Sequence, residues 1–66
     1  MKKISKSLYD ACEYYNSHLQ EPITTISQLF GVDRHSITRH LSDYKKFCYL
    51  KDNYYYLSED ELILYN

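Results

Sequence analysis

The sequence predicts a mainly α-helical domain with a core of three helices, a short β-hairpin and a short C-terminal helix. Three observations lead to this prediction. Before residue 47, apolar residues recur every three or four positions, which is the spacing of one helix face. Two runs of strand-forming residues then flank a pair of turn-forming residues. The 66 residues suffice for one domain, residues 1–66, with a small core.

The first predicted helix covers about residues 4–19. Its apolar face is formed by Ile4, Leu8, Ala11, Cys12, Tyr15 and Leu19. Pro22 ends this helix, because the proline ring disfavours the helical conformation of the residue before it.

The second predicted helix covers about residues 23–30. Its short apolar stripe consists of Ile23, Ile26, Leu29 and Phe30. Gly31 follows at a position suited to a left-handed cap. The start of the helix stays open, because Thr25 with Gln28 also fits a capping box.

The third predicted helix covers about residues 34–46. Asp33 is a good N-cap, because its carboxylate can accept hydrogen bonds from the free amides of the first turn. One face of this helix carries the apolar residues Ile37, Leu41 and Tyr44. The other face carries Arg34, His35, Thr38, Arg39, Ser42, Lys45 and Lys46.

A β-hairpin is predicted from residues 47–50 and 54–57. Asp52 and Asn53 both tolerate positive φ, which favours a two-residue turn between the strands. The resulting register gives one face made of Cys48, Leu50, Tyr55 and Leu57 and another made of Tyr49, Lys51, Tyr54 and Tyr56. A slip by one residue would exchange the faces, and only the more apolar character of the first set favours this register.

A short C-terminal helix is predicted over about residues 59–65. Ser58 and the three acidic residues after it form a capping box at its start. Four consecutive apolar residues then surround the helix axis, so one packing surface cannot cover them all. We expect Ile63 and Leu64 to remain partly exposed and to form a homodimer contact or a contact with a downstream domain. The alternative is that one of the two simply contacts the first helix.

Composition favours binding over catalysis. A core of this size rarely encloses a substrate pocket, and no Ser, His or Asp spacing suggests a nucleophile with its base. We therefore expect no enzyme activity, no small-molecule substrate and no cofactor. The sequence contains neither a signal peptide nor an apolar run long enough to cross a bilayer, so we expect a cytoplasmic protein without membrane contact and with reduced thiols.

The charges are distributed unevenly along the chain. The formal net charge is −1, which by itself argues mildly against nucleic acid binding. Residues 34–51, however, contain five basic residues and one acidic residue, for a net charge of +4, whereas residues 52–66 carry −4. The basic stretch is of the kind that a phosphate backbone attracts.

The segment from Ile26 to Leu41 meets the requirements for two helices joined by a sharp turn. Gly31 permits the turn, Val32 supplies a buried aliphatic residue and Asp33 caps the next helix. Ser27 is small where the two helices must approach each other closely. The buried positions of this motif are occupied by Ile26, Phe30, Val32 and Ile37.

This segment resembles the helix-turn-helix domains of site-specific resolvases and invertases and of many bacterial and phage regulators. The resemblance covers about 20 of the 66 residues, and Ser27 stands where alanine is more usual. The chain leaves no room for a resolvase's catalytic domain, so recombinase activity is not carried over. The hairpin after the third helix makes the layout more similar to winged helix-turn-helix regulators.

The resemblance implies sequence-specific binding of double-stranded DNA, with the third helix in the major groove. We expect a small transcription regulator or the DNA-binding domain of a phage or mobile-element protein. The residues expected to reach base edges are Arg34, His35, Thr38, Arg39 and Ser42. Contacts to phosphates are expected from Lys45, Lys46 and Lys51.

Several alternatives remain open from the sequence. One alternative is that the polar face of the third helix is only a solvated surface. Another is that the domain is a protein–protein interaction module on a winged-helix fold. Tyr49, Tyr54 and Tyr56 are candidate wing contacts, but they can also shield a thin sheet. His35 and His40 lie about 140° apart on a helix, which makes them poor partners for a metal.

Overall fold

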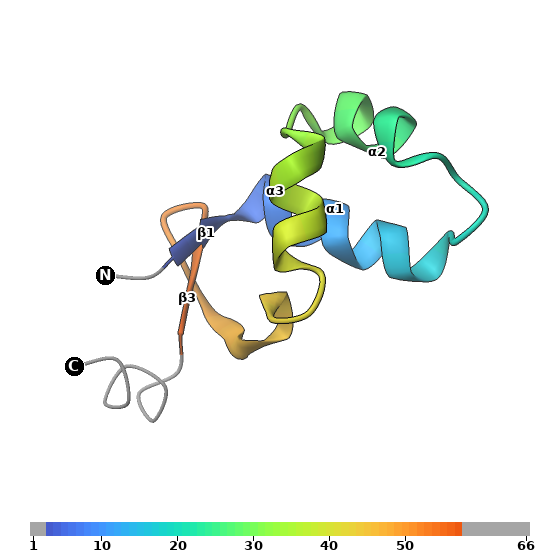
Figure 1. The fold of residues 1–66 in the computed structure, drawn as a ribbon. Helices are drawn as coiled ribbons and strands as arrows, with labels where there is room; N and C mark the ends of the chain where they lie inside the picture. The colour runs from blue at the N-terminus through green and yellow to red at the C-terminus, as the bar shows by residue number, and fades with distance from the viewer. Residues whose placement is uncertain (1–2, 58–66) are drawn as a thin grey trace.

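In the computed structural model, which describes residues 3–57, three helices are followed by a β-hairpin (Figure 1). A short strand at the start of the chain completes a three-stranded antiparallel sheet with strand order β1-β3-β2. The elements are β1 (Lys3–Ser5), α1 (Lys6–Ser17), α2 (Ile23–Phe30), α3 (Arg34–His40), a 3-10 helix (Tyr44–Lys46), β2 (Phe47–Lys51) and β3 (Tyr54–Leu57). The structure therefore confirms the predicted order of three helices followed by a β-hairpin. The predicted C-terminal helix, with Ile63 and Leu64, lies outside the described residues.

The start of the chain forms a strand rather than the first turn of a helix. Residues 3–5 pair with Tyr56, Tyr55 and Tyr54 of β3, so Ile4 enters the core from β1. Helix α1 begins at Lys6, directly after β1. Ser5 is its N-cap, and the Ser5 side chain accepts a hydrogen bond from the Leu8 amide at 3.1 Å. The prediction of a helix over residues 4–19 was therefore wrong at its start.

The end of α1 also differs from the prediction. The helix ends at Ser17, and the His18 amide donates hydrogen bonds back to the Tyr14 and Tyr15 carbonyls at 2.9 and 3.3 Å. Leu19 lies beyond this cap and is 73% exposed, so its expected place on the core face was wrong. The apolar periodicity continued past the point where the backbone leaves the helix.

Helix α2 has the predicted limits. It begins after Pro22, whose extended backbone serves as the N-cap, so the capping box with Thr25 is not used. It ends at Gly31, which has φ 68° and ψ 34°, as expected for a left-handed cap. Pro22 and Gly31 therefore mark the two ends of the helix.

Helix α3 is shorter than the predicted helix over residues 34–46. It ends at His40, a turn follows, and Tyr44–Lys46 form a separate 3-10 helix. Ser42 and Asp43 both favour turns over helix interiors, because their side chains compete for backbone hydrogen bonds. The change of direction brings Tyr44 into the core, where it is 1% exposed.

The hairpin confirms the predicted turn and most of the predicted register. Asp52 and Asn53 have φ of 53° and 67°, and Leu50 pairs with Tyr55. The register shifts between Phe47 and Tyr49, so Phe47 rather than Cys48 lies opposite Leu57. Cys48 is exposed, and its predicted place on the inner face was wrong because the bulge inserts it as an extra residue.

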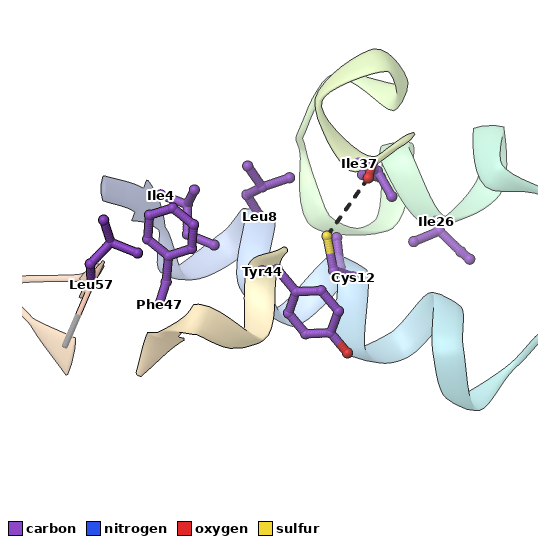
Figure 2. Packing of buried hydrophobic residues seen from close by; sticks show 9 residues of the cluster. Ile4, Leu8, Cys12, Ile26, Ile37, Tyr44, Phe47 and Leu57 are labelled. Atoms are coloured by element: carbon purple, nitrogen blue, oxygen red, sulfur yellow. Dashed lines mark hydrogen bonds between the residues drawn. The ribbon is translucent and has the colours of Figure 1, made fainter. Parts of the chain in front are cut away.

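One hydrophobic core connects the sheet to the three helices. The core consists of Ile4, Leu8, Ala11, Cys12, Ile26, Ile37, Tyr44, Phe47 and Leu57. Figure 2 shows Ile4, Phe47 and Leu57 at the sheet end and Ile26 and Ile37 at the helical end. Between these groups, the Cys12 thiol lies 3.9 Å from the Ile37 carbonyl oxygen, to which it donates a weak hydrogen bond (Figure 2). The core therefore fixes α3 directly against α1.

Candidate nucleic-acid interface

The turn between α2 and α3 is held by hydrogen bonds in both directions. The Val32 amide donates to the Ser27 carbonyl at 3.1 Å, and the Ser27 hydroxyl donates to the Val32 carbonyl. The Asp33 carboxylate accepts a hydrogen bond from the His35 amide at 2.9 Å, which confirms Asp33 as the N-cap. Ser27, expected to allow close approach of the two helices because it is small, therefore also connects the turn to α2 through these hydrogen bonds.

Helix α3 packs through one side and leaves the other side in solvent. Ile37 is fully buried, and Leu41, just after the helix, is partly buried against the core. The exposed residues of the helix include Arg34, His35, Thr38 and Arg39. At about 100° per residue, these four side chains span about 140° of the helix circumference. The structure therefore brings four of the five predicted base-contact residues together on one surface.

The two arginines of this surface have no acidic partner nearby. Among residues 3–57, no carboxylate lies within 4.0 Å of the Arg34 or Arg39 guanidinium group. The neighbouring carboxylates have other partners: Asp33 lies 3.5 Å from the His35 ring nitrogen, and Asp43 lies 3.2 Å from that of His40. The hydrogen-bond donors of both arginines therefore face solvent rather than a neighbouring acid.

Thr38 has part of its hydrogen-bonding capacity occupied within α3. Its hydroxyl donates to the Arg34 carbonyl at 3.1 Å, one helical turn earlier. The oxygen can still accept a hydrogen bond, and the methyl group remains available for apolar contact. Such a residue suits contact with a thymine methyl group better than donation to a base.

The other predicted contacts do not extend α3. Ser42 is exposed in the turn after the helix, and Lys45 and Lys46 are exposed on the 3-10 helix. Tyr44 of the same 3-10 helix is buried, so the two lysines lie on the solvent side of a segment anchored in the core. Their predicted position on one continuous helix with Arg39 was wrong, because the backbone turns at residues 41–43.

The remaining predicted residues lie on the hairpin. Lys51 pairs with Tyr54, and Tyr49 pairs with Tyr56 across the two strands. Lys3 lies beside these hairpin residues, with its ammonium nitrogen 4.4 Å from the Tyr54 ring centroid. The sequence did not indicate this position. Only recognition of β1 as a strand could have revealed this residue, and a three-residue strand has no distinctive periodicity.

Burial affects the ionisation of one thiol beneath α3. Cys12 is fully buried, and loss of solvation raises the pKa of its thiol to about 11, with smaller contributions from Asp43 and Glu13. A thiol that stays protonated is a poor nucleophile and a poor metal ligand. Within residues 3–57 there is also no group of three His, Cys, Asp or Glu side chains arranged to hold a metal ion.

Comparison with known proteins gave no family. No protein-family model, no curated protein and no solved structure matches the chain. No helix within the described part of the chain is long and apolar enough to cross a membrane.

Proposed function

We propose that this domain binds double-stranded DNA sequence-specifically, with α3 in the major groove. The protein would be a small transcription regulator, or the DNA-binding part of a phage or mobile-element protein, acting in the cytoplasm. The proposal rests on the helix-turn-helix resemblance of residues 26–41 and on the chemistry of the surface that α3 leaves exposed.

One observation carries the proposal. Arg34 and Arg39 are both exposed on a helix that Ile37 fixes in the core, and no carboxylate of the described residues lies within 4.0 Å of either guanidinium group. A guanidinium group can donate two parallel hydrogen bonds to the O6 and N7 atoms of guanine. A merely solvated helix face does not require two unpaired arginines five positions apart.

The other residues have supporting roles in this proposal. His35, Thr38 and Ser42 would contact base edges next to the arginines, while Lys45, Lys46 and Lys51 would position the domain on phosphates. Two turns of helix suffice for this task, since α3 has seven residues and a length of about 10 Å. An α-helix with its side chains is about 10–12 Å across, so it fits the major groove, which is roughly 12 Å wide.

A single domain of this size supplies few contacts, so assembly belongs to the proposal. A homodimer through Ile63 and Leu64, which lie outside the described residues, would present two copies of α3 to half-sites about one helical turn apart. A contact of the same residues with a downstream domain is the other possibility that we retain.

Selection of bound sequences from a random duplex library tests the proposal. We expect an enriched motif with guanines, bound with an affinity that decreases steeply with salt, by a log–log slope near −0.9 per phosphate contact. The double variant Arg34→Ala/Arg39→Ala should lose the motif. Absence of duplex binding at about 50 mM salt, for both the selected pool and genomic DNA, would rule the proposal out.

A protein-interaction module is the second candidate. It is favoured by Leu29 on α2 and Leu19 in the loop before it, which are 62% and 73% exposed. Exposed leucines of this kind can contribute to a protein interface. Leu29→Ser should then abolish binding to a partner while it leaves duplex binding unchanged.

A further inference from the structure

The three-stranded sheet has an outer face with its own composition. Ile4 is buried, and Tyr55 stacks on Tyr9 of α1 with ring centroids 4.0 Å apart, so these residues define the inner face. Because side chains alternate along a strand, their neighbours face outward. We call this the tyrosine–lysine face, and it consists of Lys3, Tyr49, Lys51, Tyr54 and Tyr56.

The residues of the tyrosine–lysine face interleave rings and charges. Tyr56 lies between Lys3 on β1 and Tyr49 on β2, and Tyr54 lies opposite Lys51. The Lys3 ammonium nitrogen is 4.4 Å from the centroid of the Tyr54 ring and 5.9 Å from that of Tyr56. An anion bound by Lys3 would therefore lie beside two tyrosine rings.

This face is accessible and carries positive charge. Tyr49 is 60% exposed and Tyr54 39% exposed, and Lys3 and Lys51 are exposed as well. The remaining strand residues near this face are Ser5 and the bulge residue Cys48, so no position on the outer face of the described strands carries an acid. Aromatic rings that alternate with lysines suit bases joined by phosphates, since the rings stack on bases and the ammonium groups pair with phosphates.

From this arrangement we propose that the tyrosine–lysine face binds a single-stranded segment of DNA or RNA. Two or three bases stack on Tyr49, Tyr54 and Tyr56, and the intervening phosphates pair with Lys3 and Lys51. A duplex fits this face less well, because its bases are already stacked on one another and expose no ring face to the tyrosines. The site shares Lys51 with the phosphate contacts proposed for a duplex but contains neither arginine of α3, and the inference does not depend on duplex binding by that helix.

The site lies at one end of the molecule. Figure 1 shows β1 and β3 beside the start of α1, whereas α2 lies toward the far end of α1. The inner face of the sheet is turned toward α1, as the contact between Tyr55 and Tyr9 shows, so its outer face points away from the helices. A single strand on this face would therefore leave the exposed side of α3 accessible.

Fluorescence anisotropy with labelled single-stranded 12-mers of deoxythymidine and of uridine tests the proposal on the full chain. We expect saturable binding of at least one of them, and the two oligomers show whether DNA or RNA is preferred. Tyr49→Leu and Tyr54→Leu should each weaken binding at least about five-fold, because each removes one stacking platform. Leucine retains apolar bulk at both exposed positions, and circular dichroism would verify that the variants fold.

Arg39→Ala is the control on the other surface. It should leave the affinity for the single strand unchanged, whereas the tyrosine variants should leave duplex affinity unchanged. Chemical-shift mapping on the wild-type protein provides a second measurement that needs no variant, and the shifts should concentrate on β1, β2 and β3. Absence of binding at about 100 μM protein, equal losses in Arg39→Ala and Tyr49→Leu, or shifts confined to α3 would each overturn the proposal. Equal affinity for a duplex through the same tyrosines would also overturn it and make this face a duplex contact.

Discussion

The Asn16 side-chain amide donates a hydrogen bond of 2.7 Å to the Tyr44 hydroxyl and so connects α1 to the 3-10 helix that follows α3. The Tyr44 ring also makes an edge-on contact with Tyr9 of α1, with centroids 5.2 Å apart. Lys45 and Lys46 are the next residues, so this anchor determines where two proposed phosphate contacts lie relative to α3. Stability and the proposed function therefore depend on the same tyrosine.

Removal of the Tyr44 hydroxyl should destabilise the domain modestly. Tyr44→Phe deletes one partly buried hydrogen bond and should lower the free energy of unfolding by about 0.5–1.5 kcal/mol, whereas Tyr44→Ala also leaves a cavity and should cost about 3–5 kcal/mol. Urea unfolding of both variants provides the measurement. Asn16→Ala completes a double-mutant cycle with Tyr44→Phe, and strictly additive losses would show that the two side chains do not interact.

Substitution of Gly31 should test the turn between α2 and α3. Its φ of 68° favours glycine, and no heavy atom lies within 4 Å of the position that a β-carbon would occupy. Gly31→Ala should therefore lower stability by backbone strain alone, by about 1–2 kcal/mol. Gly31→Asn should cost less, because asparagine tolerates this conformation. Thermal unfolding distinguishes the two, and a greater loss for asparagine than for alanine would indicate steric rather than backbone strain.

Local backbone chemistry explains which parts of the fold were predictable. Gly31, Asp33 and the Asp52-Asn53 pair each require a particular conformation or cap, and the structure contains all of these features as predicted. The sequence also indicated which side of α3 is buried, because Ile37 marks it. The exposed arginines of the candidate site follow from that assignment.

Longer-range packing explains the rest. Ile4 continues the apolar spacing of α1 but pairs with Tyr55, and only the position of β3 in space decides between helix and strand there. Tyr44 continues the spacing of α3 but reaches the core after a turn, because its partner Asn16 lies on α1. The bulge at Cys48 likewise depends on how Phe47 packs opposite Leu57. Periodicity along the chain contains no information about these partners.

The buried thiol of Cys12 should make stability depend on pH in the alkaline range. Its pKa is raised to about 11 in the folded state, above the ordinary value of 9.0 for the unfolded chain. The unfolded state therefore loses this proton first, and stability is fully present below pH 9. Stability decreases between pH 9 and about 11, by at most about 1.4 kcal/mol per pH unit for this group.

Urea unfolding from pH 8 to pH 11 measures this dependence. Burial also raises the pKa of Tyr9, which acts in the same direction, so Cys12→Ala serves as the control that isolates the thiol. The alanine variant is less stable overall but should show a shallower decrease. Thiol labelling provides independent evidence: the exposed Cys48 should react in the native protein and Cys12 only on unfolding. Rapid labelling of both thiols would contradict the burial of Cys12.

Arg39 and Lys46 should affect duplex binding differently, although both are exposed cations near α3. Arg39→Ala should cost about 1–3 kcal/mol on the selected sequence and relax the preference at one base pair, because it removes a fork that can donate two hydrogen bonds to guanine. Lys46→Ala should weaken all sequences to the same extent and reduce the salt slope by about one, since it removes only attraction to a phosphate. Arg39→Lys distinguishes charge from geometry, because it keeps the cation and loses the fork, so it should resemble the alanine variant in specificity. Competition binding against duplexes mutated at single positions measures all three variants. If Arg39→Ala and Lys46→Ala weakened every sequence equally, Arg39 would not read a base, and the proposed orientation of α3 in the groove would have to be abandoned.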